Sequence, residues 1–164
     1  MYVQLSLGSN MGDRSSALQA ALRALSGESG ITLRSHSHCY ETEPIGIKDQ
    51  PAFLNMAAEI ETELAPLELL KVVKAIEQRI GRHKTTRWGP REIDIDLILW
   101  GDTVFSSERL TLPHKEFRQR AFVLVPMAEI APDQIDPVTG ATIAELVKGP
   151  DVEGWIKKRA KIVP

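Results

Sequence analysis

Among the features of this sequence, the order of its strand-like and helix-like hydrophobic patterns most restricts the folds that the chain can adopt. Residues 2–8 alternate between apolar and polar side chains, as a half-buried strand does. Asp13 suits the N-cap of a following helix, and Gly27 and Gly30 suit its end. The apolar residues of this helix recur at intervals of three and four and are Leu18, Ala21, Leu22 and Leu25. The chain therefore begins with a strand and an amphipathic helix.

The same two patterns recur after a pair of strands. Residues 31–43 begin with β-branched side chains and are expected to form one long strand. A loop with two prolines, 44–53, leads into a second alternating stretch, 53–64. Pro66 suits the first turn of another helix. The apolar stripe of that helix consists of Leu69, Val73, Ile76 and Ile80. Residues 93–100 then alternate as a final strand.

The resulting order, β-α-β-β-α-β, predicts an α+β fold of the ferredoxin-like type. Each helix has one apolar stripe, so both are expected to cover the same face of the sheet and to leave the other face open. Beyond residue 100, stretches 101–105 and 108–112 suit a short hairpin, and stretches 121–131 and 142–149 suit two further helices. The length of 164 residues fits a single domain over residues 1–164.

Charge and cysteine content exclude several classes of protein. A formal net charge of −2 argues against bulk nucleic-acid binding, which requires a strongly basic surface. Cys39 is the only cysteine, so neither a disulfide framework nor a thiolate metal cluster is expected. The sequence contains neither a secretory leader nor an apolar run that approaches the length of a membrane span. We therefore expect a cytoplasmic protein, and nothing in the sequence demands more than a monomer.

Two aspartates, Asp94 and Asp96, point the same way from the last strand, IDIDLILW. Aspartate is depleted in strands, and like charges on one face repel each other. The face opposite the helices is expected to carry Gln4, Ser6, Phe53, Asn55, Asp94 and Asp96. One interpretation is a solvated strand face, and the other is a site for magnesium or calcium, which prefer oxygen ligands. Ile98 and Trp100 are expected to continue the face with apolar side chains, which favours the wall of a site.

Basic residues surround this strand in the sequence. A first group directly precedes it and comprises Arg79, Arg82, Lys84, Arg87 and Arg91. Guanidinium groups beside paired carboxylates suit a metal-bound polyphosphate, although a solvated charged loop is the alternative interpretation. A second group follows the hairpin and comprises Arg109, His114, Lys115, Arg118 and Arg120. For His114, the sequence supports a structural role and a phosphate-binding role equally.

Two common nucleotide-binding motifs are absent from the sequence. It contains no GxxxxGK[ST] phosphate loop, and GSNMGD lacks the GxGxxG pattern of dinucleotide-binding folds. The residues by themselves therefore indicate a magnesium-dependent enzyme that acts on a nucleotide polyphosphate. A pocket beside Phe53 and Asn55 is expected to take a flat polar molecule.

Four motifs together resemble those of the 6-hydroxymethyl-7,8-dihydropterin pyrophosphokinase family. They are LGSNMGDR (7–14), FLN (53–55), RWGPREIDIDLI (87–98) and LPHKEFRQRAFVLVP (112–126), and they occur in the family's order. The resemblance implies the transfer of diphosphate from ATP to the hydroxymethyl group of 6-hydroxymethyl-7,8-dihydropterin, with release of AMP, in folate biosynthesis. It also implies a ferredoxin-like fold and two Mg²⁺ ions.

The resemblance assigns roles residue by residue. Asp94 and Asp96 would bind the two magnesium ions and act in catalysis together with Arg82 and Arg91. The ATP side would comprise Leu70, Glu77, Arg82, Lys84, Trp88, Arg91, Ile98, Arg109, Thr111, His114 and Arg120. The pterin side would comprise Thr42, Glu43, Pro44, Ile45, Phe53, Asn55 and Phe122, with Phe53 and Phe122 stacking on the ring. The chain departs from the family pattern in the loop RHKTTR, where His83 or Lys84 could take the second basic role, and at Lys74 and Lys115.

Two alternative functions belong to other classes. A magnesium-dependent phosphohydrolase would release AMP or ADP without forming a diphosphorylated pterin. A ferredoxin-like binding module, such as an RNA-recognition domain, would carry basic and aromatic residues on its central strand. Asp94 and Asp96 would repel phosphates there, so the module is disfavoured.

Overall fold

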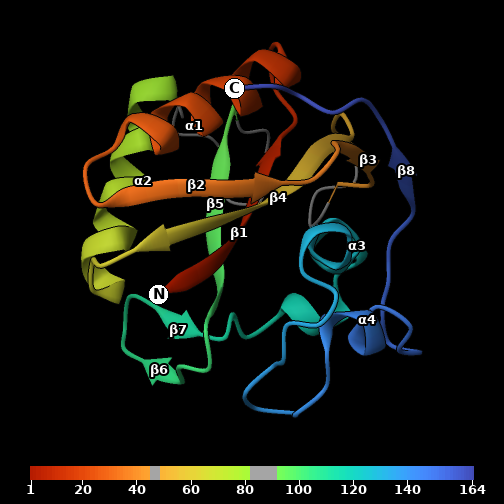
Figure 1. Cartoon of the computed structure of the whole chain (residues 1–164). Helices are drawn as coiled ribbons and strands as arrows, with labels where there is room; N and C mark the ends of the chain where they lie inside the picture. Colours follow the sequence, from red (N-terminus) through yellow and green to blue (C-terminus); the bar gives the residue numbers. More distant parts are fainter. Residues whose placement is uncertain (45–48, 82–91) are drawn as a thin grey trace.

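The computed structural model describes residues 1–44, 49–81 and 92–164, and its main feature is an antiparallel sheet (Figure 1). The strands of this sheet are β1 (Tyr2–Ser9), β2 (Ile31–His36), β3 (Tyr40–Thr42), β4 (Phe53–Thr62), β5 (Asp94–Trp100) and β8 (Ile156–Lys158). Their order across the sheet is β5-β1-β4-β3-β8, and β2 also pairs with β4. β1 and β4 therefore form the centre, and the aspartates of β5 lie on an edge strand.

The stretch 31–43 is not one strand, as the sequence suggested, but two. β2 and β3 pair with different parts of β4, and residues 37–39 between them leave the ladder. The Ser37 hydroxyl accepts a hydrogen bond from Ala57 N (2.9 Å) and donates one to His38 O (2.7 Å). A serine side chain that binds backbone groups in this way competes with regular strand pairing, which explains the break.

Helices α1 (Arg14–Gly27) and α2 (Pro66–Ile80) cover one face of the sheet, as predicted (Figure 1). Asp13 caps α1 by accepting a hydrogen bond from Ser16 N (3.0 Å). The predicted stripe of α1 is fully buried, and that of α2 is buried except at its last residue, Ile80, which is partly buried. These stripes pack on the side chains of alternate residues of β4, which are Leu54, Met56, Ala58 and Ile60.

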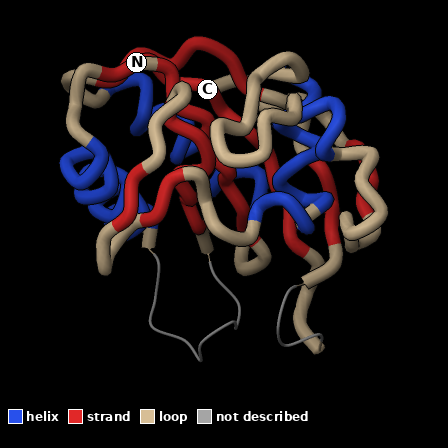
Figure 2. The backbone as a smooth tube through the Cα atoms, turned by 90° about the horizontal axis from the view of Figure 1, so that it is seen from below, coloured by secondary structure: helices blue, strands red, loops and turns tan. Residues whose placement is uncertain are grey.

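The opposite face is not open, which corrects the expectation from the sequence. Helix α3 (Ala121–Ile130) packs across β4, and Figure 2 shows helices on both sides of the strands. This second core comprises Ala57, Ile98, Leu99, Phe117, Val123, Leu124, Met127 and Ile143. The sequence of α3, AFVLVPMAEI, is apolar around most of the helix, so it requires burial on more than one side.

Smaller elements complete the part of the chain that the structure describes. The predicted hairpin is β6 (Phe105–Ser106) with β7 (Thr111–Leu112), and the last predicted helix is a short α4 (Ile143–Leu146). A 3-10 turn, η1 (Phe117–Gln119), precedes α3. Strand β8 comes from the tail, for which the sequence indicated no structure, and it extends the sheet beyond β3. Across the described ranges, every helix is too short or too polar to cross a membrane.

Candidate active site

Asp94 and Asp96 lie on the same face of β5, opposite the residues of the first core. Gly8 and Ser6 of β1 are their respective neighbours across the sheet. The two aspartates are half-buried, whereas Ile95 between them is fully buried under α2. The sequence therefore predicted correctly that their side chains project from one face.

The apolar continuation of this face differs from the expectation. A register shift between Gln4 and Leu5 interrupts the pairing of β1 with β5. Ile98 packs in the second core, but so does Leu99, and Trp100 belongs to the first core under the helices. A one-residue irregularity moves every side chain beyond it to the opposite face of the strand. Strict alternation of the two faces therefore does not continue past this point.

The environment of the aspartate pair disfavours two negative charges. Burial and, after it, the neighbouring Asp94 carboxylate raise the pKa of Asp96 to about 7, against the opposing effect of Lys74. A divalent cation would relieve this repulsion, and carboxylate oxygens are ligands that magnesium prefers. Within the described ranges, no group of three or more histidine, cysteine, aspartate or glutamate side chains is arranged to hold a metal. The pair therefore fits magnesium that takes its remaining ligands from water or from phosphate oxygens.

Glu77 of α2 fixes the backbone between the two aspartates. Its buried carboxylate accepts a hydrogen bond from Ile95 N (2.7 Å) and forms an ion pair with Lys74 Nζ (3.2 Å). Leu70, two turns earlier on α2, is also buried. Lys74, one of the departures from the family pattern, thus has a structural partner, while Lys115 is exposed.

His114 and Arg120 lie close enough to the aspartates to interact with them electrostatically. Burial and, after it, the positive charge of Arg120 lower the pKa of His114 to about 4, whereas Asp94 acts in the opposite direction. Arg120 also lowers the pKa of Asp96. The His114 backbone N–H donates to Ile98 O (2.9 Å), which ties the segment after β7 to β5. Tertiary folding therefore brings two members of the second basic group, His114 and Arg120, to the acidic pair.

Arg120 makes two further contacts. It forms an ion pair with Glu116, and its guanidinium lies 5.4 Å from the centre of the Phe122 ring. Arg118, by contrast, pairs with the buried Asp136 (2.6 Å) and serves the fold. Arg109 and Thr111 are exposed on the β6–β7 hairpin.

Three predicted pterin-side residues, Thr42, Phe53 and Asn55, lie where β3 pairs with β4, and β1 runs along the other side of β4. Asn55 of β4 donates a hydrogen bond to the Thr42 hydroxyl (2.6 Å), and both side chains are buried. Thr42 also pairs across the sheet with Phe53. A Cβ atom on Gly8 would clash with the Asn55 amide oxygen and touch the Phe53 ring. The role of Gly8 was not predicted, although a glycine inside a strand often marks such a close approach.

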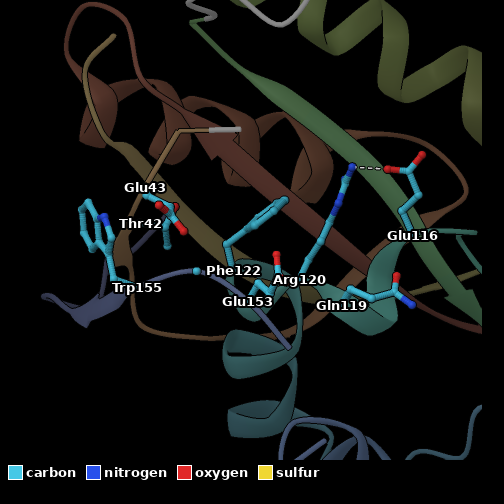
Figure 3. Close-up of a pocket in the computed structure, with 9 residues that line it drawn as sticks. Thr42, Glu43, Glu116, Gln119, Arg120, Phe122, Glu153 and Trp155 are labelled. Atoms are coloured by element: carbon cyan, nitrogen blue, oxygen red, sulfur yellow. Dashed lines mark hydrogen bonds and ion pairs between the residues drawn. The ribbon is translucent and has the colours of Figure 1, made fainter. Parts of the chain in front are cut away.

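A cavity of about 290 Å³ opens beside these residues (Figure 3). Four predicted residues line it, namely Thr42, Glu43, Arg120 and Phe122. Five that were not predicted also line it, namely Glu116, Gln119, Glu153, Gly154 and Trp155. Pro44, which follows Glu43, is buried. Of these five, only Trp155 left a signal in the sequence that could have pointed to this wall, as an aromatic residue in the tail.

Several predicted residues lie outside the described ranges. They are Ile45, Arg82, His83, Lys84, Trp88 and Arg91.

Comparisons with known proteins identify the family. The model of 7,8-dihydro-6-hydroxymethylpterin-pyrophosphokinase (HPPK) matches residues 4–132. A 2-amino-4-hydroxy-6-hydroxymethyldihydropteridine pyrophosphokinase from Methylorubrum extorquens is 47% identical over 92% of this chain and 94% of its own length. The protein of the same name from Haemophilus influenzae is 44% identical over 88% of this chain and 89% of its own length.

Longer proteins contain a similar part. The folic acid synthesis protein fol1 of Schizosaccharomyces pombe is 45% identical over 86% of this chain, which spans only 19% of that protein. The crystal structure of Plasmodium falciparum HPPK-DHPS matches with a TM-score of 0.72 at 17% identity, over 89% of this chain and 44% of that one. This structural likeness shows the shared fold, and the sequence matches show that the chain belongs to the 7,8-dihydro-6-hydroxymethylpterin-pyrophosphokinase family.

Proposed function

We propose that the chain transfers diphosphate from ATP to the hydroxymethyl group of 6-hydroxymethyl-7,8-dihydropterin and releases AMP, a step of folate biosynthesis. The observation that carries this proposal is the family match over residues 4–132, which includes the aspartate pair and the cavity residues Thr42 and Phe122. The ferredoxin-like description of the fold and the single domain over residues 1–164 are part of the same proposal. The strand order supports the former, since β5, β1 and β4 follow one another across the sheet and β2 and β3 both pair with β4.

Asp94 and Asp96 would hold two Mg²⁺ ions together with the phosphate oxygens of ATP. Magnesium bound there would supply positive charge that neutralises the phosphates and lowers the pKa of the pterin hydroxyl. The role of the protein is then to orient both substrates, because phosphoryl transfer depends mainly on positioning and charge stabilisation. Glu77 contributes by fixing the backbone N–H between the two aspartates.

Arginine side chains would stabilise the charge that the departing AMP takes up. Arg82 and Arg91 are the proposed catalytic pair, and Arg120 and His114 would add donors on the phosphate side. Leu70, Glu77, Lys84, Trp88, Ile98, Arg109 and Thr111 would complete the ATP side. The weakly basic His114 would bind as a neutral hydrogen-bonding ring near pH 7, because its pKa is lowered to about 4.

The pterin ring would stack between Phe53 and Phe122. Asn55 and Thr42, which share a buried hydrogen bond, would recognise the polar edge of the ring, and residues 43–45 would complete the pocket. The cytoplasmic location, the monomeric state and the absence of nucleic-acid binding stay predictions from the sequence.

Product analysis with ATP, magnesium and 6-hydroxymethyl-7,8-dihydropterin tests this function. We expect AMP and diphosphorylated pterin in equal amounts, and at least a ~100-fold loss of rate in Asp96→Ala, since one electrostatic group is worth about that much. Asp102→Ala is the matched control, because Asp102 is an exposed aspartate just beyond the same strand. AMP or ADP without pterin product would replace this function by phosphohydrolysis, and no turnover by a folded wild type would refute it.

A further inference from the structure

The wall of the cavity opposite α3 comes from the tail of the chain. Glu153, Gly154 and Trp155 line the same cavity as Thr42 and Phe122 (Figure 3). These three residues lie beyond residue 132, where the match to the family model ends. We propose that Trp155 is a specificity-determining residue that forms a third aromatic wall for the pterin ring. Since this role rests on the proposed function, the experiments below separate the two.

The tail segment 153–158 is fastened first to the start of α3. Glu153 N donates to Gln119 O (2.9 Å), and Ala121 N donates to Glu153 O (3.1 Å). These bonds form a parallel bridge between Arg120 and Glu153. Glu153 is therefore held within two residues of Phe122, the predicted stacking residue.

The segment is fastened a second time by β8. Ile156 pairs with Thr42, and Lys158 pairs with Tyr40, which places the strand directly beside β3. Beyond it, Arg159 Nη2 bonds Glu41 Oε1 (2.7 Å) and Arg159 N donates to Cys39 O (2.7 Å). Trp155 lies between the two attachments, so its backbone is held from both sides.

Gly154 makes the turn between these attachments possible. Its φ of +110° lies in the left-handed region that side chains avoid, and a Cβ atom there would lie 3.3 Å from Glu43 Oε1. Glycine thus lets the chain turn close to Glu43 and brings the next residue to the cavity.

The indole of Trp155 remains 49% exposed although its backbone is fixed. A tryptophan that served only to hold the tail would be expected to bury its ring, and backbone hydrogen bonds already hold this tail. A large flat side chain on a fixed backbone suits contact with a flat heteroaromatic ring. Its neighbours Phe122 and Thr42 are residues assigned to the pterin.

The charges of this wall favour the pterin over the phosphates of ATP. Glu43 and Glu153 both line the cavity, with Glu43 next to Trp155, whereas Arg120 points toward Glu116 (Figure 3). Carboxylates repel phosphate oxygens but attract the N–H donors along a pterin edge. Trp155 should therefore affect the binding of the pterin and leave that of ATP unchanged.

Steady-state kinetics of Trp155→Ala and Trp155→Phe test the assignment. Because Phe53 and Phe122 would occupy the two faces of the ring, Trp155 would contact its edge. We therefore expect Trp155→Ala to raise the KM for the pterin roughly three- to tenfold, as loss of one edge-to-face aromatic contact does, with the KM for ATP within about twofold of wild type. Trp155→Phe should restore most of the affinity. Val163→Ala is the matched control, because Val163 is an exposed apolar side chain of the same tail outside the cavity. An unchanged KM for the pterin, or a lower kcat and thermal midpoint without a change in KM, would overturn the assignment.

Fluorine NMR gives a second test that does not depend on turnover. Incorporation of 5-fluorotryptophan labels all three tryptophans, and the resonance that Trp155→Phe removes identifies Trp155. Addition of 6-hydroxymethyl-7,8-dihydropterin with a non-transferable ATP analogue should shift that resonance. If the wild type makes diphosphorylated pterin but this resonance does not shift, the role of Trp155 is refuted and the proposed function is not. If the wild type forms no product, the function fails, and an unmoved resonance would then refute the pterin contact as well.

Discussion

Asp136 is a fully buried carboxylate that holds η1, the turn from which the chain leads into Arg120 and α3. It accepts hydrogen bonds from Arg118 Nε (2.6 Å) and Nη2 (3.0 Å), the Thr139 hydroxyl (2.7 Å) and Val138 N (3.0 Å). Burial by itself would raise the pKa of Asp136, but these hydrogen bonds outweigh it and hold the pKa below the usual 3.8. The sequence grouped Arg118 with phosphate-type residues because it could not show this partner.

Replacing Asp136 by asparagine should therefore have an effect that depends on pH. At pH 7 we expect the free energy of unfolding to fall by roughly 1.5–3 kcal/mol, the range for hydrogen bonds to charged groups. A depressed pKa contributes stability that is fully present above the unfolded value and is lost as the pH falls through the folded value. The difference between wild type and Asp136→Asn should thus be constant above about pH 5 and shrink below pH 3.8.

Urea unfolding at several pH values measures this difference. Asp133→Asn, which changes an exposed aspartate three residues away, should leave stability unchanged at every pH. A difference for Asp136→Asn that does not vary with pH would show that the ionised carboxylate is not what stabilises the turn.

At the scale of elements, glycines lie at the ends of the two major helices, but the helices end differently. Gly81 follows α2 with a φ of +107°, and its N–H donates to the carbonyl groups of Gln78 and Glu77. Gly27 is instead the last residue of α1, and the helix is capped by Glu28 in an extended conformation. The left-handed turn after α1 is made by Gly30, with a φ of +82°.

This difference predicts opposite effects of the same substitution. Gly81→Ala should lower the free energy of unfolding by about 1–2 kcal/mol, because a Cβ atom disfavours the left-handed conformation. The new methyl group would also lie 2.5 Å from Glu92 Oε2. Gly27→Ala meets open space and should raise stability by roughly 0.4–1 kcal/mol, since it restricts the unfolded chain. Thermal and urea unfolding of both variants give the comparison, and equal effects would contradict this account of the two helix ends.

At the scale of the whole molecule, one sheet separates two cores. Leu22 of α1 is buried in the first core, and Leu124 of α3 is buried in the second. Strand β4 contributes Met56 to one core and the adjacent Ala57 to the other. Because the same strands form the floor of both cores, neither core can lose its packing without affecting the other.

The two cores are therefore expected to unfold together. Leu22→Ala and Leu124→Ala should each lower the free energy of unfolding by about 2–5 kcal/mol, the range for truncation of a buried leucine. Both should shift one transition that circular dichroism and fluorescence follow identically. Val104→Ala, at a side chain that is 65% exposed, should leave the midpoint unchanged. Separate transitions for the two cores in either variant would contradict cooperative unfolding.

The sequence by itself determined the features that depend on local order. The spacing of apolar residues in α1 and α2 predicted which side of each helix is buried, because burial requires apolar residues on one side of a 3.6-residue repeat. The alternation around Asp94 and Asp96 likewise predicted that both carboxylates share one face. The motifs at residues 7–14, 53–55, 87–98 and 112–126 were sufficient to identify the family, since they occur in its order and the stretch at 87–98 is long and specific.

Only the tertiary structure decided which distant segments meet. The division of 31–43 at Ser37, the approach of Gly8 to Asn55 and the placing of His114 and Arg120 beside the aspartates all depend on partners far away in the chain. The tail gave no periodic signal, yet β8 pairs with β3 and brings Trp155 to the cavity. Periodicity reports that a side chain is buried or exposed, but it does not report its partner. The partner of each side chain depends on the free energy of packing the whole chain. Contacts between residues distant in sequence contribute to that free energy as much as local contacts do.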